Sequence, residues 1–448
     1  MAGLDWPAIP GANGNIMLGL LFQLEQSQWW PAEKLQAQQF RQAGQLLRYA
    51  RAQVPFYRER LKGFAWDGRQ PLDPSLWAQL PVLRREDIQT HGGRALLSEK
   101  YPKSHGKTRQ VNTSGSSGKP LTVTSSAMAA IFWNVITLRD FLWRRLDFSA
   151  KMAAIRFDEK RRATYPEGAV VDFWLKSAQP FLATGPCAVL DISTPVDKQV
   201  EWLARQEANY LITYPSNLEA MLLHCVEAQI DLPTLSQIQT FSEALHPRVR
   251  ALCQEVWGLD LSDMYSCNET GYIALQCPGR DHYHVQSENI IVEIIDAEGN
   301  SCAPGERGRV VLSDLHNFAM PLIRYDVGDY AEFGELCSCG RGLPVLKNVI
   351  GRVRGMLTLA DGSRIRPDFG GRRFHEVADI RQYQVIQKSR DKLEVKLVAP
   401  GGLSDSETLA LRQMISAQLG HPFEVAFSFH DEIPRSAGGK FEDFRSEI

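Results

Sequence analysis

The sequence Thr113-Ser114-Gly115-Ser116-Ser117-Gly118-Lys119-Pro120 is the strongest local signal in this chain. Its glycines leave the backbone room to wrap around an anion, while hydroxyl groups, backbone N–H groups and Lys119 supply donors and a positive charge. It is not a Walker loop, which has four residues between its glycines and Ser or Thr after its Lys. Here two residues separate the glycines, and Pro120 follows the Lys. From the residues alone, a phosphate-binding loop and a Ser/Gly surface turn both stay open.

The composition limits what can surround this loop. With 448 residues the chain exceeds one compact core, and about 150 residues per domain predicts two or three domains. Lys and Arg number 50 and Asp and Glu 52, so the formal charge of −2 gives no general basic field for nucleic acid. No apolar run approaches the ~18 residues of a membrane span. The first basic residue is Lys34, so the N-terminus does not resemble a signal peptide. We therefore expect a cytoplasmic protein with no nucleic-acid or membrane partner.

Downstream of the loop, short apolar runs alternate with helical patterns. Behind Pro31, apolar residues on a helical period predict a helix over residues 31–53, which Pro55 ends. Between about 190 and 257 we expect a helix opening at Ser193-Thr194-Pro195, a strand at 210–214, a helix at 217–230, a strand at 238–241 and a helix at 247–257. This alternation predicts a parallel sheet covered by helices.

The pattern changes after about residue 286. Segments 289–295, 308–312 and 331–333 are strand-like and no long helix separates them, so they predict a small antiparallel or barrel-like β unit. A second boundary falls near residues 351–355. Beyond it, strands at 383–387, 393–397 and 424–429 and a helix at 404–419 predict a compact α+β domain.

The loop at 113–120 resembles the phosphate loop of the adenylate-forming (ANL) superfamily. This superfamily contains acyl-CoA synthetases, luciferases and peptide-synthetase adenylation domains. Further motifs follow in family order: residues 241–245 resemble the "GEP" segment beside the adenine, 265–271 the "YGxTE" motif, 324–329 the "RYxxGD" ribose segment, 351–352 the hinge, and 434–440 the loop with the catalytic lysine. Residues 54–58, 80–83 and 337–341 resemble the phenylacetate-CoA ligase branch. Residues 360–362 and 439–441 look closest to its capsular polysaccharide biosynthesis (CapK-type) relatives.

The resemblance covers roughly residues 40–448 and implies an α/β fold. Residues 1–350 would form the AMP-binding adenylation domain, with helix-covered sheets and a β-barrel-like part. Residues 351–448 would form a small mobile α+β domain that carries the catalytic lysine. Arg354 stands where family members often have a hinge aspartate, which leaves the identity of the hinge pivot open.

The resemblance also assigns chemistry to particular residues. Lys440 would stabilise charge between the substrate carboxylate and the α-phosphate, and Glu269 would bind Mg²⁺ through its carboxylate. Tyr265 would flank the adenine and Asp329 would accept hydrogen bonds from the ribose; core packing for Tyr265, a cap or turn for Glu269 and a Gly-Asp turn for Asp329 are the alternatives. The other expected ATP or AMP contacts are Thr113, Ser114, Gly115, Ser116, Ser117, Gly118, Lys119, Ser242, Glu243, Ala244, Ser266, Asn268 and Arg352.

A second group of residues offers metal ligands. Cys277, His284, Cys337 and Cys339 supply three thiolates and an imidazole, enough for a closed tetrahedral zinc site. Some phenylacetate-ligase relatives carry a metal at such positions, with a histidine in the place of His284; His282 is the substitute ligand. The C-x-C spacing is irregular, so unpaired cytosolic thiols are the alternative.

Together these features predict a two-step ATP-dependent acid–thiol ligase with Mg²⁺. An acid, by resemblance an aromatic one, would become an acyl-adenylate and then pass to coenzyme A. Cys267, Trp133, Trp143 and Trp174 are candidates for the acyl pocket, with core packing as the alternative for the tryptophans. A carrier-protein thiol, or an amine or hydroxyl group, stays open as the acceptor, and so does a homodimer. Asn268 and Ser242 depart from the family pattern and motivate a third hypothesis, a non-catalytic nucleotide-binding protein.

Overall fold

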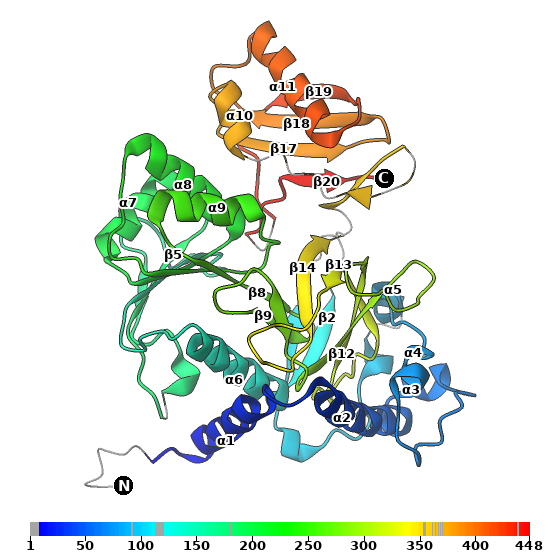
Figure 1. The fold of residues 1–448 in the computed structure, drawn as a ribbon. Helices are drawn as coiled ribbons and strands as arrows, with labels where there is room; N and C mark the ends of the chain where they lie inside the picture. The colour runs from blue at the N-terminus through cyan, green and yellow to red at the C-terminus, as the bar shows by residue number, and fades with distance from the viewer. Residues whose placement is uncertain are drawn as a thin grey trace. The chain divides into compact units, whose positions relative to one another are not determined.

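The fold is described from a computed structural model that covers residues 9–90, 93–112, 121–179, 181–352, 355–360, 362, 364–365, 367, 369, 371–436 and 439–448 (Figure 1). The chain divides into two compact units, each built from three segments. The first unit takes residues 1–150, 172–186 and 262–349, and the second takes 151–171, 187–261 and 350–448. The predicted division at residue 350 cuts the chain differently and stays a prediction.

The helices of the first unit mostly precede its sheet in sequence. They are α1 (Ala12–Ser27), α2 (Ala32–Gln53), α3 (Pro55–Arg60), α4 (Pro74–Ala78), α5 (Arg85–Thr90) and α6 (Ala127–Trp143). Helix α2 buries Leu35, Phe40 and Leu47 on the period that predicted it, and it ends before Pro55 as expected. Pro55 then begins α3, since a proline tolerates the first helical position. Of these helices only α2 was predicted; α1, α3, α4, α5 and α6 were not.

The main sheet of the first unit has the strand order β11–β12–β13–β14–β10–β9–β8. Its strands are β8 (Leu261–Cys267), β9 (Gly271–Gln276), β10 (Tyr283–Val285), β11 (Ile290–Ile295), β12 (Arg307–Asp314), β13 (Tyr325–Phe333) and β14 (Val345–Arg352). Neighbours β11–β12, β12–β13, β8–β9, β9–β10 and β10–β14 pair antiparallel. This confirms the expected antiparallel unit, although the strand expected at 331–333 is only the end of the longer β13.

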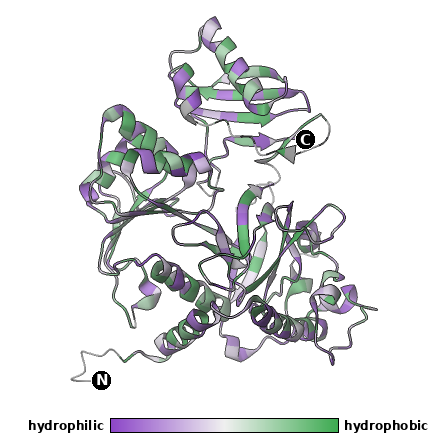
Figure 2. Ribbon diagram, viewed as in Figure 1, coloured by the Kyte–Doolittle hydropathy of each residue, from purple (hydrophilic) through white to green (hydrophobic). Residues whose placement is uncertain are grey.

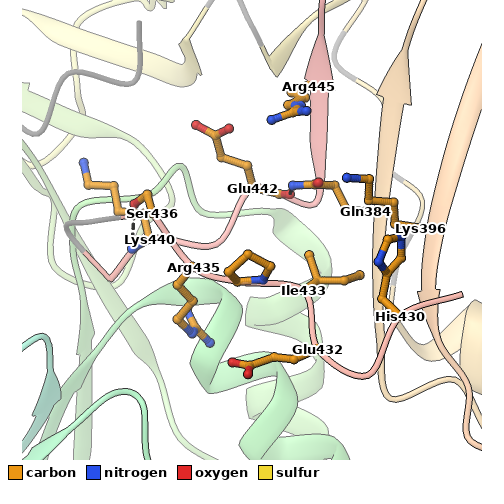
Figure 3. A pocket seen from close by; sticks show the side chains of 11 residues that line it. Gln384, Lys396, His430, Glu432, Ile433, Arg435, Ser436, Lys440, Glu442 and Arg445 are labelled. Carbon is orange, nitrogen blue, oxygen red and sulfur yellow. Dashed lines mark hydrogen bonds between the residues drawn. The ribbon is translucent and has the colours of Figure 1, made fainter. Parts of the chain in front are cut away.

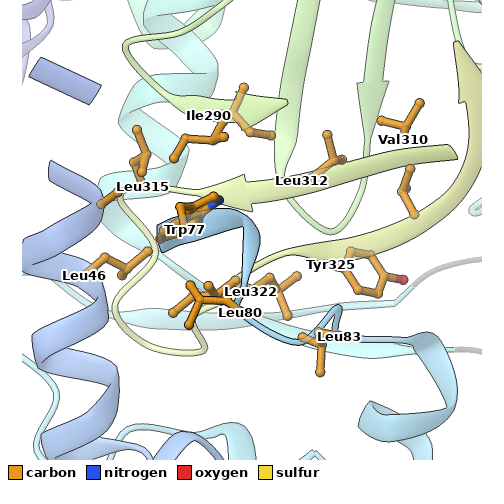
Figure 4. Close-up of a cluster of buried hydrophobic side chains, with 14 of the residues drawn as sticks. Leu46, Trp77, Leu80, Leu83, Ile290, Val310, Leu312, Leu315, Leu322 and Tyr325 are labelled. Carbon is orange, nitrogen blue, oxygen red and sulfur yellow. The ribbon is translucent and has the colours of Figure 1, made fainter. Parts of the chain in front are cut away.

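The core of the first unit lies between α2, the segment around Trp77 and strands β11 to β13 (Figure 4). Leu46, Trp77, Leu83 and Tyr325 are almost completely buried there. Leu83 also pairs with β13 through its backbone: its N–H donates to the Arg324 carbonyl at 2.8 Å, and its own carbonyl accepts the N–H of Asp326 at 2.9 Å. This packing fixes the 324–329 segment, which carries one of the predicted site motifs.

The second unit contains a mostly parallel sheet with the strand order β7–β6–β3–β5–β4. Its elements are β3 (Met152–Arg156), β4 (Ala169–Val171), β5 (Cys187–Asp191), α7 (Val196–Gln206), β6 (Tyr210–Thr213), α8 (Pro215–Ala228), β7 (Gln237–Thr240) and α9 (Pro247–Trp257). Only β4 pairs antiparallel within this sheet. Helices α7 to α9 carry both hydrophobic and hydrophilic residues, as expected for helices with one face on a sheet (Figure 2). The predicted parallel sheet is confirmed. The sequence pattern placed Pro195 in the first turn of its helix, but Pro195 is the residue directly before α7.

A smaller α+β part follows in the second unit. Its sheet has the order β19–β18–β17–β20, with β15 and β16 as a separate short pair. The elements are β15 (Leu357–Thr358), β16 (Arg364–Ile365), α10 (Gly371–Val377), β17 (Gln382–Gln387), β18 (Lys392–Val398), α11 (Asp405–Leu419), β19 (Glu424–Phe429) and β20 (Phe444–Ser446). Ser404 and Glu407 form a capping box at the start of α11. Strands β17, β18 and β19 and helix α11 match the predicted strands and helix closely, whereas β15, β16, α10 and β20 were not predicted.

None of the helices in the described ranges has both the length and the apolar composition needed to cross a membrane.

Candidate functional site

The predicted phosphate loop, residues 113–120, lies outside the described residues, so the positions of Thr113, Ser114, Gly115, Ser116, Ser117, Gly118 and Lys119 are not described. Its two flanks are described. Strands β1 (Thr108–Asn112) and β2 (Thr122–Ser126) pair antiparallel, with Asn112 opposite Thr122. Thr122 Oγ1 donates a hydrogen bond to Asn112 Oδ1 at 2.8 Å. The chain therefore enters and leaves the loop at one end of a hairpin.

Two of the predicted nucleotide residues meet in the first unit. Tyr265 lies on β8 and Asp329 on β13, 64 residues later in the sequence, and the Tyr265 hydroxyl donates to Asp329 Oδ2 at 2.8 Å. Both residues are buried. The tertiary structure thus brings together the motifs that resemble the adenine-flanking and ribose-binding segments.

Glu269 lies in the turn between β8 and β9, with its side chain only 3% exposed. Its Oε1 lies 3.7 Å from the Arg85 guanidinium, a partner that no sequence motif indicated. Nearby, the Cys267 thiol lies 3.1 Å from Thr270 Oγ1. Burial raises the pKa of Cys267, and the negative charges of Glu269 and Asp329 raise it further. The thiol is therefore neutral, and both carboxylates lie close enough to influence it. In the same strand and turn, Ser266 is half-buried and Asn268 exposed.

One of the three candidate tryptophans lies beside this turn. Gly271 has φ +85°, and a Cβ there would be 3.3 Å from the Trp133 ring. The ring centres of Trp133 and Tyr272 are 4.6 Å apart, and Trp133 is 37% exposed. In contrast, Trp143 is buried, and Trp174 stacks on Phe148, with its indole N–H donating to the Ala150 carbonyl. The last two tryptophans therefore take part in internal packing.

The 242–244 segment lies in the second unit, after β7. Ser242 has φ +74°, in the left-handed region that favours glycine, which gives a physical reason for the glycine usual in this motif. Glu243 accepts two backbone N–H groups, from Ser216 at 3.0 Å and from Phe441 at 2.8 Å. Ala244 approaches Gly351 so closely that a Cβ on that glycine would be 3.0 Å from the Ala244 Cβ. The neighbouring Arg352 is the last residue of β14.

Lys440 belongs to a loop that precedes β20 and borders a cavity of about 240 Å³ (Figure 3). The Lys440 N–H donates to Ser436 Oγ at 3.2 Å, and the Lys440 carbonyl accepts the Ser436 N–H at 2.8 Å. Lys396, His430, Arg435 and Arg445 line the same cavity, so several cationic side chains gather around it. Two hydrogen bonds thus join Ser436 to Lys440, and Glu432 and Glu442 line the cavity beside the cations.

The four predicted zinc ligands converge in the first unit. The ligand atoms of Cys277, His284, Cys337 and Cys339 all lie within 4.8 Å of one another. The thiols of Cys277 and Cys337 are 3.9 Å apart, and the Cys339 Sγ is 3.3 Å from His284 Nε2. Zn–S bonds of about 2.3 Å at tetrahedral angles place two sulfurs about 3.8 Å apart. The donor set and its spacing therefore fit a zinc ion.

His284 is also oriented as a metal ligand would be. Its Nδ1 lies 3.3 Å from the Leu343 carbonyl, so a proton there leaves the Nε2 lone pair directed at the thiols. His282, the substitute ligand, lies outside the cluster, with its ring centre 5.5 Å from that of His284. Burial and the neighbouring thiols of Cys339 and Cys337 raise the pKa of Cys277 to about 12. A bound cation would reverse this effect, because it favours the thiolate.

Comparison with known proteins agrees with the motifs. Residues 357–446 match the family model of the CapK C-terminal domain. The chain is 22% identical over 447 residues to phenylacetate-coenzyme A ligase of Thermus thermophilus, over 92% of this chain and 96% of that protein. The predicted enzyme class, an acid–thiol ligase, is the class that this relative's name gives.

Among solved structures, the chain resembles 2-hydroxyisobutyryl-CoA ligase in the postadenylation state with R3-HIB-AMP (TM-score 0.71, 16% identity, 94% of this chain and 92% of that one). It also resembles the same ligase with 2-HIB-AMP and CoA in the thioesterification state (TM-score 0.59, 16% identity, 94% and 92%). These likenesses concern the fold. The family match of residues 357–446 and the similarity to phenylacetate-coenzyme A ligase agree with the resemblance to the phenylacetate-CoA ligase-like branch, and the solved structures show that the chain shares the fold of an adenylate-forming CoA ligase.

Proposed function

We propose that this protein activates a carboxylic acid with ATP and transfers the acyl group to coenzyme A. First, a carboxylate oxygen attacks the α-phosphorus of ATP, the bond from that phosphorus to pyrophosphate breaks, and an acyl-adenylate forms. Then the coenzyme A sulfur attacks the acyl carbon, its proton is released and AMP leaves. The hydrogen bond between Tyr265 and Asp329 carries the proposal, because it joins the expected adenine and ribose residues in one place.

Glu269 is the residue that would hold Mg²⁺. The ion prefers carboxylate oxygens, and the buried side chain of Glu269 offers them. The Asp329 carboxylate lies close enough to raise the pKa of the neighbouring Cys267 thiol. A bound ion would supply charge neutralisation at the ATP phosphates. The Arg85 guanidinium lies 3.7 Å from Glu269 Oε1 and forms an ion pair with this carboxylate.

Lys440 is the proposed source of positive charge for the first half-reaction. A lysine is a compact cation that stabilises charge developing on the attacked phosphate. Residues 351–448 would carry it as a mobile domain, and residues 1–350 would carry the adenylation site, with the 113–119 loop at the phosphates. The proposed nucleotide contacts also include Ser242, Ala244, Ser266, Asn268 and Arg352.

An aromatic acid is the proposed substrate class. Trp133 supports this choice, because its partly exposed ring lies beside the Glu269 turn and a flat aromatic face suits an aromatic acyl group. Coenzyme A is the proposed acceptor. A carrier-protein thiol or an amine differs only in the second half-reaction, so the acceptor can be tested apart from adenylation.

We propose a structural zinc ion at Cys277, His284, Cys337 and Cys339. The closed set of four protein ligands leaves no position for substrate, so the ion would stabilise the fold and take no part in adenylation.

Acid-dependent exchange of labelled pyrophosphate into ATP tests the first half-reaction without any thiol. We expect exchange with an aromatic acid from a panel of aromatic, aliphatic and amino acids, and thioester formation when coenzyme A is added. Exchange without thioester would keep adenylation and replace the acceptor. No exchange with any acid, in protein that binds ATP, would contradict the proposal and favour a non-catalytic nucleotide-binding protein.

A further inference from the structure

The carboxylate of Glu243 joins two segments that are far apart in the sequence. Glu243 lies in the loop after β7, and its Oε2 accepts the N–H of Ser216 at 3.0 Å. Its Oε1 accepts the N–H of Phe441 at 2.8 Å, across 198 residues of chain. Each carboxylate oxygen therefore has its own N–H donor, and one of these donors belongs to the residue directly after Lys440.

The contact with Ser216 anchors the carboxylate. Ser216 is the second residue of α8, and the residue before that helix, Tyr214, makes no side-chain cap hydrogen bond. The N–H groups of a first helical turn lack partners within the helix and favour a negative charge. Glu243 therefore caps α8 from outside, and a 14-residue helix fixes its position.

The Lys440 loop is tied to the same helix by a second side chain. Arg435 Nη1 donates to the Gly439 carbonyl at 3.2 Å and to Ser216 Oγ at 3.4 Å. Burial lowers the pKa of Arg435, while the nearby Glu243 carboxylate raises it. The guanidinium and the Glu243 carboxylate thus connect α8 to opposite sides of Lys440.

Gly439 permits the close approach that these contacts need. It has φ +77°, and a Cβ there would lie 2.8 Å from the Phe157 Cβ and 3.3 Å from the Tyr214 hydroxyl. Phe157 follows β3 and Tyr214 follows β6. The loop therefore lies directly on the carboxyl ends of the parallel strands, where open α/β sheets bind their ligands.

We propose that Glu243 is a positioning residue for Lys440: its carboxylate ties the Phe441 amide to the N-terminus of α8 and so fixes the backbone that presents the lysine. The inference rests on the proposed function for the role of Lys440 in adenylate formation. In this proposal Glu243 acts by holding the loop that presents Lys440, whereas the motif resemblance placed Glu243 among the nucleotide contacts.

Three variants of the full-length protein separate these roles. Glu243→Gln has one acceptor oxygen and one NH₂ group, so it can accept from only one of the two N–H groups and sets a donor against the other. Glu243→Asp keeps both oxygens on a shorter side chain. Glu227→Gln, at an exposed site on α8, removes the same charge without touching the loop and is the matched control.

Exchange kinetics supply the first readout. We expect Glu243→Gln to lower kcat for ATP–pyrophosphate exchange by about 10- to 100-fold, the effect of a misplaced catalytic group, with the KM for ATP little changed. Glu243→Asp should retain more activity, and Glu227→Gln should equal the unmodified protein. In a Lys440→Ala background, Glu243→Gln should cause no further loss, because both residues act through one group. A raised KM with unchanged kcat, or an additive loss, would overturn the proposal.

Hydrogen exchange supplies a readout that needs no activity. The amide of Phe441 should exchange faster in Glu243→Gln than in the unmodified protein, and Glu227→Gln should leave it unchanged. If no acid supports ATP–pyrophosphate exchange, the proposed function fails, yet this comparison still decides whether Glu243 holds the loop. Equal amide exchange in Glu243→Gln and the unmodified protein would overturn the positioning role.

Discussion

The guanidinium of Arg341 lies 4.1 Å from the ring centre of Trp143 and 4.7 Å from that of Trp29, so one cation contacts two indoles. Arg341 Nε also donates to Gln28 Oε1 at 2.8 Å, and the next residue, Gly342, donates its N–H to the Gln28 carbonyl at 2.9 Å. Arg341 follows Cys339 by two residues. The loop that carries two of the proposed zinc ligands therefore holds the connection between α1 and α2.

This relationship gives the zinc proposal a structural consequence. Purified protein never exposed to a chelator should contain about one zinc per chain. Removal of the zinc should release the loop that carries Cys337, Cys339 and Arg341. We then expect faster protease cleavage near residues 27–32, because the contacts of Gln28 and Trp29 depend on that loop. Elemental analysis and limited proteolysis check the two effects.

Two cysteine variants serve as a matched pair for the zinc prediction. Cys339→Ser should lose the metal and become protease-sensitive, whereas Cys302→Ser, outside the cluster, should keep both properties of the unmodified protein. Absence of zinc from the unmodified protein would contradict the metal site. Unchanged proteolysis after metal loss would contradict its link to α1.

Lys440→Ala should lower the rate of adenylate formation by about 10²- to 10³-fold, the usual effect of removing one group that stabilises transition-state charge. ATP binding and the free energy of unfolding should change little. Lys392→Ala is the control: this lysine is on β18 and pairs only with Glu424 at the surface in the described structure, a contact worth little. Single-turnover adenylate formation is the measurement, and equal rates for the two variants would contradict the role of Lys440.

Ser242→Gly should raise the free energy of unfolding by up to about 1.5 kcal/mol. An L-residue in the left-handed region, such as Ser242, destabilises the folded state by roughly 1–2 kcal/mol, and a glycine removes this cost. The greater backbone entropy of glycine in the unfolded state cancels about 0.5–1 kcal/mol of the gain. Denaturant unfolding of both proteins checks the value. Ser242→Ala keeps the Cβ and its backbone cost, so it should bring no gain; a similar gain from both variants would point to the lost hydroxyl instead.

Asp314 and His316 should have opposite effects on stability as the pH changes. Burial raises the pKa of Asp314 to about 7. The N–H groups of His316 and Asn317, which donate to its carboxylate, act in the opposite direction and lower the pKa. Burial lowers the pKa of His316 to about 4, and the nearby His105 lowers it further. Folding thus retains a proton on Asp314 and removes one from His316. The Asp314 contribution is lost as pH rises from about 4 to about 7, and the His316 contribution is lost as pH falls from about 6.5 to about 4.

Between about pH 4 and pH 6.5 the two effects cancel, since the folded and unfolded states then hold equal numbers of protons at this pair. Replacing one residue reveals the other. Asp314→Asn should make stability rise with pH in this range, by at most about 1.4 kcal/mol per pH unit, and His316→Gln should make it fall. Denaturant unfolding at several pH values measures both slopes relative to the unmodified protein. Slopes of the same sign would contradict the prediction.

Regular elements with a clear period were predictable from the sequence. Helix α9 covers Pro247–Trp257 and strand β19 covers Glu424–Phe429, the ranges expected from local pattern. Helix α6 escaped prediction because its residues are apolar almost all round, which hides the helical period: Phe132, Val135, Ile136 and Phe141 are buried on a broad face. Helix α1 is also largely apolar, and Glu25 is its single charged residue.

The candidate site divides in the same way. The ordered motifs named Glu269, Tyr265, Asp329 and Lys440, because each belongs to a short segment whose residues can be compared directly with a family pattern. Arg85 was missed, since a single arginine far from Glu269 in sequence carries no local signal. The link from Glu243 to Phe441 was missed for the same reason.

The sequence by itself determined the fold class, the order of the motifs and the residue types available for chemistry, because local periodicity and short motifs depend on neighbouring residues. Only the tertiary structure decided which of these residues meet. It joined Tyr265 to Asp329, brought His284 and not His282 to the three thiols, and placed Glu243 on the Lys440 loop. Such choices depend on how strands and helices pack across long stretches of chain, and side-chain packing fixes those contacts to within a few ångströms.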